Sequence, residues 1–415
     1  MLEPDHTIAR VLELPREAGT PAAAEARRLL ALHLERLGYT VRERRFSFPA
    51  ATLSAFPLAG AGLGWLTLVQ IPLLTVAGGP SWLALASWVF GIASLGVVVG
   101  GVALGWTALG GEVREDANLV AMRPGTRPKR WVVAHTDAIG FGQSLWGRWL
   151  TVAAGMATIA AFLGLGVVRL EGPVGVDMVG LAAALAVATC GLSVRAGRRV
   201  ASVGARDGGT GLYAALAAAA RATDGSLGLL LTGAREFGLV GARIAAKEDG
   251  AILRSASVVD MGILDDAGVL SVVIHGPGAV DYAASLAARL DSQGLKVRRA
   301  TRGTGRFTDG SVLSRRAASA LSLVRGARST AARVHTIRDV PDGLGFRTAA
   351  AVGEAVAVNG GDALAANGGD ALAANGGDTL AANGGDTLAA NGGDTLAANG
   401  GDTLAANGGD TLAAN

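Results

Sequence analysis

Cysteine is almost absent from this sequence: the single one, Cys190, lies in an apolar run. One cysteine excludes an intrachain disulfide and a cysteine-based metal cluster. We interpret Cys190 as an inert packing residue. The first residues, MLEPDHTIARVLELPRE, have no basic segment followed by an apolar one, so we expect no cleavable signal peptide.

Charged residues are also scarce. They make up 17% of the chain against 50% hydrophobic residues, an apolar composition for a soluble protein. None occurs between Arg45 and Glu112. Because a bilayer span needs about 20 apolar residues, we expect two spans there, near 57–77 and 81–104. A buried core of this length would need charged residues at its helix ends and turns, and the run contains none.

Two further charge-free runs predict a second hairpin, with spans at 149–168 and about 174–194. Four spans return the chain to its starting side. Nearly all basic residues near the spans lie on that side, whereas the opposite loops have only Arg169. Because basic residues mark the cytoplasmic side, we predict a multi-pass protein of the cell membrane whose soluble parts are cytoplasmic.

The remaining segments alternate strand and helix patterns, which is typical of an α/β domain. Residues 20–38 predict an amphipathic helix, and runs such as LGLLL and RWVVAH predict buried strands. We therefore assign one α/β domain to the separated segments 1–53, 112–148 and 195–358, with hairpins at 54–111 and 149–194 and a tail at 359–415.

The tail consists of seven copies of an octapeptide, NGGD(A/T)LAA, followed by a final Asn. One Leu per unit buries little surface, which favours a disordered, low-complexity tail. The alternative is a stacked β-solenoid of the calcium-binding kind, although those repeats have a period of nine and more Asp.

Polar residues follow several of the expected strands and turns. The carboxyl ends of strands face the ligand crevice of an α/β sheet. We therefore expect these polar residues to form one site: His135, Asp137, Asp207, Glu236, Asp260 and His335. Imidazoles and carboxylates suit zinc or a similar divalent metal. Two histidines and three acids match a two-metal site, whose ions lie about 3.5–4 Å apart. The remaining acid, Asp137, can orient the His135 ring.

The segments VVAHTDAIG, GARDGGTG, GAREFGLVG, VVDMG and VHTIRD together resemble the M28 family of zinc peptidases, which includes aminopeptidases with two zinc ions. The resemblance covers about 20–48, 113–140 and 200–357, with the membrane hairpins inserted between these blocks. It implies a mixed-sheet α/β zinc-peptidase domain with helices on both faces. It also implies a peptide or N-terminal amino-acid substrate, and we expect no nucleic-acid partner.

The same resemblance assigns ligand roles. Asp207 would bridge the two zinc ions. His135 and Asp260 would complete one ion, and Glu236 and His335 would complete the other.

One position departs from the family. Where the family has two adjacent glutamates, this chain has Arg235-Glu236. The second residue, by the resemblance a metal ligand, is kept, but the first is the general base that takes a proton from the attacking water. Arginine stays protonated at physiological pH, and general-base help is typically worth about 10²–10⁴-fold in rate. A second departure is Thr308-Asp309-Gly310, where the family often has an Asp-His pair near the substrate pocket.

Three functions remain open at this point. The first is a membrane-bound zinc aminopeptidase, slowed by Arg235 or served by another carboxylate. The second is an inactive pseudopeptidase that keeps the metals for binding or structure. The third, a transporter, has only one acid within the spans, Asp177, and that acid lies near a span end.

Overall fold

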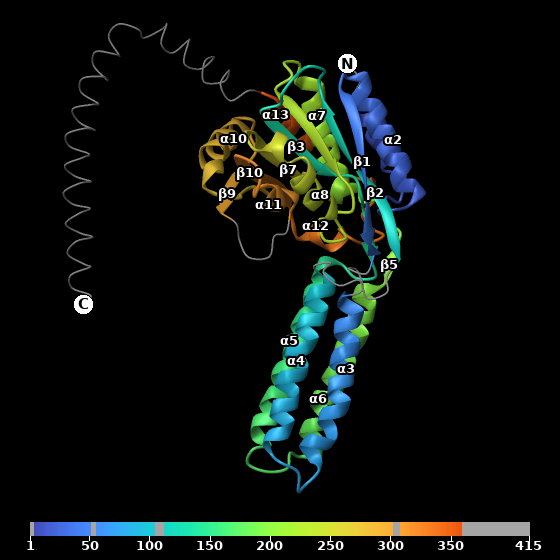
Figure 1. Cartoon of the computed structure of the whole chain (residues 1–415), viewed down its shortest axis with the longest axis vertical. Coiled ribbons are helices and arrows are strands. Elements are labelled where there is room, and N and C mark those ends of the chain that lie inside the picture. Colours follow the sequence, from blue (N-terminus) through green and yellow to red (C-terminus); the bar gives the residue numbers. More distant parts are fainter. Residues whose placement is uncertain (1–3, 51–54, 104–111, 302–307, 359–415) are drawn as a thin grey trace, which may run out of the picture. The chain divides into compact units, whose positions relative to one another are not determined.

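The computed structural model describes residues 4–50, 55–103, 112–301 and 308–358 (Figure 1). The chain divides into two units, Met1–Ala357 and Val358–Asn415. The repeat tail at 359–415, with the expectations for it, lies outside the described residues.

The centre of the first unit is an eight-stranded mixed sheet in the order β1-β2-β6-β3-β7-β10-β8-β9. The four middle strands, β6, β3, β7 and β10, run parallel, and β2 and β8 join them antiparallel on either side. The strands are β1 (Thr40–Pro49), β2 (Val113–Met122), β3 (Arg130–His135), β6 (Leu227–Thr232), β7 (Ser257–Leu264), β8 (Val269–Ile274), β9 (Val297–Thr301) and β10 (Ser319–Gly326). A separate two-stranded sheet pairs β4 (Gly140–Phe141) with β5 (Arg199–Val200).

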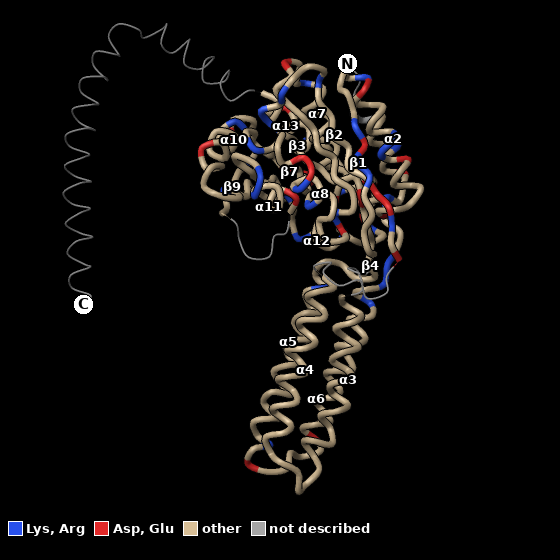
Figure 2. The backbone as a smooth tube through the Cα atoms, viewed as in Figure 1, with Lys and Arg blue, Asp and Glu red and all other residues tan. Residues whose placement is uncertain are grey.

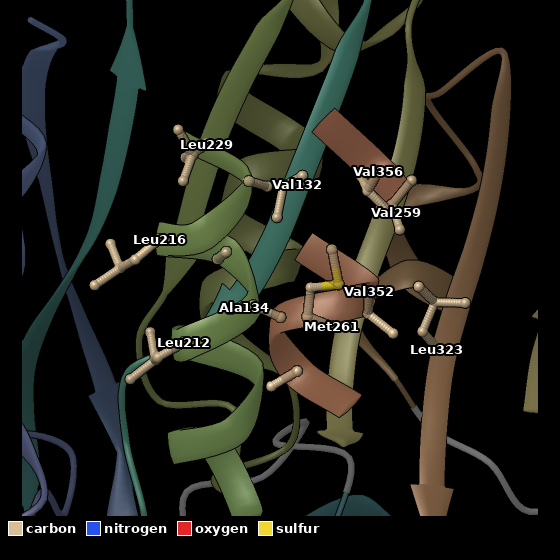
Figure 3. Close-up of a cluster of buried hydrophobic side chains, with 14 of the residues drawn as sticks. Val132, Ala134, Leu212, Leu216, Leu229, Val259, Met261, Leu323, Val352 and Val356 are labelled. Carbon is tan, nitrogen blue, oxygen red and sulfur yellow. The ribbon is translucent and has the colours of Figure 1, made fainter. Parts of the chain in front are cut away.

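Helices cover both faces of this sheet, as the sequence predicts. Successive strand residues point to opposite faces: Val132 packs toward α7 (Thr210–Arg221) and α13 (Arg347–Ala357), as Figure 3 shows, while its neighbour Val133 packs on the other side with α8 (Val240–Glu248). The other helices of the domain are α1 (Pro4–Val11), α2 (Pro21–Arg36), α9 (Gly250–Leu253), η3 (Pro277–Ala279), α10 (Val280–Ser292), α11 (Asp309–Leu313) and α12 (Arg328–Arg333).

Four apolar helices pack against one another as a bundle: α3 (Ala55–Thr75), α4 (Trp82–Ala103), α5 (Leu145–Val168) and α6 (Val176–Gly197). Each is long and apolar enough to cross a membrane. Charged residues lie only toward the helix ends (Figure 2). Large apolar side chains also cover the outer surface of the bundle, among them Trp65, Phe90 and Leu181. Helices that are apolar on all sides suit a lipid environment.

The helix that contains the third predicted span begins about one turn before that span. Arg148 sets the expected boundary at Trp149, but α5 begins at Leu145, with the Ser144 side chain accepting the N–H of Gly147 as an N-cap. The Arg148 guanidinium lies over the rings of Phe141 and Phe56, at 4.2 and 4.9 Å from their centroids. These cation–π contacts satisfy the charge within the first turn.

Candidate metal centre

Parallel strands bring the predicted ligands to one end of the sheet. His135 is the last residue of β3, and Glu236 lies in the loop after the neighbouring β6. Asp207 lies in the turn before α7, and His335 in the loop after α12. One ligand atom each of His135, Asp207 and Glu236 lies within 4.8 Å of the others.

His335 completes this cluster. Its Nε2 is 3.4 Å from Oδ2 of Asp207, and its Nδ1 is 3.4 Å from Oε2 of Glu236. On the other side of the Asp207 carboxylate, Nε2 of His135 is 3.4 Å from Oδ1. Asp207 therefore lies between the two imidazoles, one facing each oxygen.

The turn that carries Asp207 depends on glycine and on a second buried acid. Asp207 leaves the helical conformation at φ −90° and ψ 113°, and Gly208 follows at φ +86°, a region that favours glycine. A Cβ on Gly208 would also lie 3.1 Å from Cε1 of His135. The Asp339 carboxylate accepts the N–H groups of Arg206 at 2.8 Å and Asp207 at 3.1 Å. Asp339 lies in the same loop as His335, and it thereby fixes the main chain at Asp207.

Asp137 does the same for the loop after β6. Its two oxygens accept the N–H groups of Arg235 at 3.1 Å and Glu236 at 3.0 Å. Oδ1 is also 3.5 Å from Nδ1 of His135. Asp137 thus lies beside the His135 ring. Its contact with the main chain of Arg235 and Glu236 is an addition to the sequence prediction.

Two positioning residues are not among the site residues that the sequence predicts. Asp339 ends the segment VHTIRD without a role assigned to it there, and Arg16 has no signal in the sequence. The Arg16 side chain is buried, and it donates to the carbonyls of Thr136 at 2.9 Å, Val203 at 2.6 Å and Gly204 at 3.2 Å. It therefore joins the loops that carry His135 and Asp207.

Asp260 is not in the group of three whose ligand atoms lie within 4.8 Å of one another, although its strand pairs with β3. Its Oδ2 accepts a hydrogen bond from Ser322 Oγ at 2.7 Å and from the N–H of Gly310 at 3.1 Å. Its Oδ1 is buried without a hydrogen-bond partner in the described part of the chain. This oxygen remains free to ligate a cation.

Several acids act electrostatically on Arg235, although its Nη1 has no hydrogen-bond partner among the described residues. Burial lowers the pKa of its guanidinium, but the charges of Asp309, Asp260, Asp207 and Glu236 outweigh burial and raise that pKa above its ordinary value. The side chain is therefore a fixed cation within the candidate centre. Burial raises the pKa of Asp309 to about 6, against the opposing charge of Arg235. Asp137 binds the main-chain N–H of Arg235. Among the acids, Asp309 raises the pKa of the Arg235 guanidinium most.

The same electrostatics govern the metal-free histidines and acids. Burial and Arg235 lower the pKa of His135, but Asp137 and Asp207 raise it to about 10 overall. Burial raises the pKa of Asp207, yet His335 and His135 outweigh burial and lower it below its usual range. Because a metal ligand must be deprotonated, binding of a metal at His135 would release a proton.

The donor set fits a divalent metal. Nε2 of His135, which faces Asp207, and Nδ1 of His335, which faces Glu236, are buried and have no hydrogen-bond partner among the described residues. Buried polar atoms are normally paired, so these nitrogens are consistent with a cation as the missing partner. Imidazole and carboxylate ligands in this number are those that zinc binds.

The fold and this site together define an α/β protein with an eight-stranded mixed sheet and a candidate metal centre at one end of that sheet. No family model and no curated protein matches the chain. Solved structures match in fold. The glutaminyl cyclase of Porphyromonas gingivalis has a TM-score of 0.51 at 12% identity, covering 86% of this chain and 95% of that one. A leucine aminopeptidase precursor from Bacteroides thetaiotaomicron has a TM-score of 0.50 at 12% identity, covering 86% and 96%. The glutaminyl cyclase of Fimbriiglobus ruber has a TM-score of 0.50 at 13% identity, covering 86% and 94%.

Proposed function

We propose that this chain is a membrane-bound metallopeptidase of the M28 type that hydrolyses the amide bond after the N-terminal residue of a peptide. The observation that carries the proposal is the cluster in which Asp207 lies between His135 and His335, with Glu236 beside it. With Asp260 as the fifth ligand, the set is sufficient for two zinc ions.

When bound, zinc polarises the scissile carbonyl and acidifies the attacking water. The chain's own residues prepare the site for this. Asp137 and Asp339 hold the main chain at Glu236 and Asp207, so the carboxylates are positioned before substrate binds. Arg235 cannot take a proton from the water. Hydrolysis by the wild type is therefore slow.

A second function, a pseudopeptidase that binds metal without cleaving, is favoured by one observation. The Asp137 carboxylate binds the main-chain N–H groups of Arg235 and Glu236, so a permanent cation stands beside Glu236 at the position of the missing base. In this case the centre would have a structural or ligand-binding role.

The test of the proposed function uses the full-length protein in detergent, with zinc content measured together with activity on a panel of aminoacyl substrates. We expect bound zinc and slow release of the N-terminal residue, abolished by a chelator and restored by zinc. The panel includes a peptide with N-terminal glutamine, because glutaminyl cyclases share the fold. Ammonia from that peptide without release of an amino acid would identify cyclisation, and bound zinc without any reaction would favour the pseudopeptidase.

We also propose that α3, α4, α5 and α6 span the cell membrane and that the α/β domain is cytoplasmic. Basic residues gather at the domain end of these helices, and Arg169 is the basic residue of the loops at the other end. Reporter fusions at residue 125 and at the C-terminus should both give a cytoplasmic signal. A signal from the opposite side of the membrane at either position would contradict this topology.

A further inference from the structure

A cavity of about 530 Å³ lies beside the candidate metal centre, a size typical of ligand sites. Its lining comes from two parts of the first unit. The domain contributes Phe141, Ile337 and Arg338, and the ends of α5 and α6 contribute Gly147, Leu192 and Arg195. A molecule in this cavity would therefore contact the α/β domain and the apolar helices together.

The cavity adjoins the metal ligand His335. Thr336, the next residue, lines the cavity, as does Phe141, whose ring centroid is 6.0 Å from that of His335. The N–H of Phe141 donates to the His335 carbonyl at 2.6 Å. The wall of the cavity is thus part of the same loop as His335.

The aromatic residues of α5 indicate the level of the cavity relative to a bilayer. Trp146 and Trp149 are 56% and 63% exposed, and they flank Gly147, which lines the cavity. Exposed tryptophans at the end of an apolar helix are typical of the membrane–water interface. Ile337 is 66% exposed at the cavity wall, an apolar surface at the same end of the bundle. With α5 and α6 across the membrane as proposed, the cavity lies at the level of the lipid headgroups.

The charge of the cavity is positive. Arg195 and Arg338 are both exposed in its lining. Arg195 uses Nε to bind the Gly142 carbonyl at 3.0 Å, and neither arginine forms an ion pair within 4.0 Å with an acid in the described part of the chain. Guanidinium groups of this kind bind carboxylates and other planar anions.

We propose that this cavity binds the segment of a membrane-associated peptide that follows its N-terminal residue, with apolar side chains against Phe141, Leu192 and Ile337 and an acidic side chain on Arg195 and Arg338. The substrate of the site would then be a peptide held at the membrane surface. This inference rests on the proposed function for what happens at the metal centre, but binding in the cavity needs no catalysis. A peptide accounts for the cavity better than a lipid headgroup, because the hydrolysis proposed for the adjoining metal centre acts on the first amide bond of a peptide.

Binding is therefore tested apart from hydrolysis, with full-length protein in nanodiscs of phosphatidylcholine and fluorescence anisotropy as the readout. The probe is a labelled peptide with a free N-terminus, an acidic residue near it and a C-terminal apolar anchor. The same peptide without the anchor is the comparison, and we expect it to bind at least about tenfold more weakly, because anchoring raises the local concentration. Ala332→Trp, an exposed substitution that fills the cavity, and Arg338→Glu should each weaken binding of the anchored probe on the order of tenfold.

Arg254→Ala is the matched control, since Arg254 is exposed and does not line the cavity. It should bind the probe as the wild type does. Equal binding by all variants would overturn the proposal. Competition of phosphatidylglycerol nanodiscs with the probe, lost in Arg338→Glu, would assign the cavity to an anionic lipid and also overturn it. Binding that follows the expected order without any hydrolysis would leave the cavity assignment in place and contradict only the peptidase function.

Discussion

Replacing Asp207 with alanine should remove the metal from both positions of the candidate centre. Asp207 presents one oxygen to each imidazole, at 3.4 Å from Nε2 of His135 and of His335. Loss of a group outside the ligand shell already costs about 10–100-fold in metal affinity, so loss of the bridging ligand should exceed about 100-fold. Zinc content after dialysis, measured by mass spectrometry of the metal, gives the result directly.

Two variants make this measurement specific. Asp281→Ala removes an exposed acid in the first turn of α10 and should leave the zinc content unchanged. His335→Ala should weaken one position more than the other, because His135 and Asp207 remain together. Equal melting temperatures of the metal-free proteins would show that Asp207→Ala still folds. Zinc retained by a folded Asp207→Ala variant would place the metal elsewhere in the protein.

The ligand segments could be predicted from the sequence because each has a local pattern. A buried strand that ends in a histidine, as in RWVVAH, or an acid in a Gly-rich turn, as at Asp207, indicates where the side chain will lie relative to the sheet. The order of the central strands then brings them together. The boundary of α5 shows the limit of such reasoning, since Arg148 interrupts the apolar pattern but its charge is satisfied by two aromatic rings.

Arg16 and Asp339 could not be predicted in the same way. Both act through main-chain groups far away in the sequence: Arg16 binds the carbonyls of Val203 and Gly204, and Asp339 binds the N–H groups of Arg206 and Asp207. Main-chain groups have no residue type, so a side chain that binds them cannot be paired with its partner from the sequence, even where it ends a motif, as Asp339 ends VHTIRD. Such positioning contacts are visible only once the loops are placed.

Changing Arg235 to glutamate should raise amide hydrolysis by roughly 10²-fold or more, the scale of a restored general base. The substitution replaces a cation that cannot accept a proton with a carboxylate at the position next to the ligand Glu236. Asp137 fixes the main chain at 235 and 236, so the new side chain would start from the same place. The ratio kcat/KM for an aminoacyl substrate, compared with that of the wild type at several pH values, is the measurement.

The charge change itself needs a control, because Arg235 also affects metal binding. Its guanidinium repels any cation that the neighbouring Asp207, Asp260 and Glu236 would hold. Arg235→Gln removes this repulsion without supplying a base. It should therefore increase zinc content as Arg235→Glu does, yet remain far slower in hydrolysis and lack the acidic limb that a titrating glutamate adds to the pH profile. If Arg235→Gln and Arg235→Glu were equally active, Arg235 would limit the wild type through metal binding alone. Ordinary turnover by the wild type, lost in Arg235→Glu, would mean that arginine itself serves the reaction.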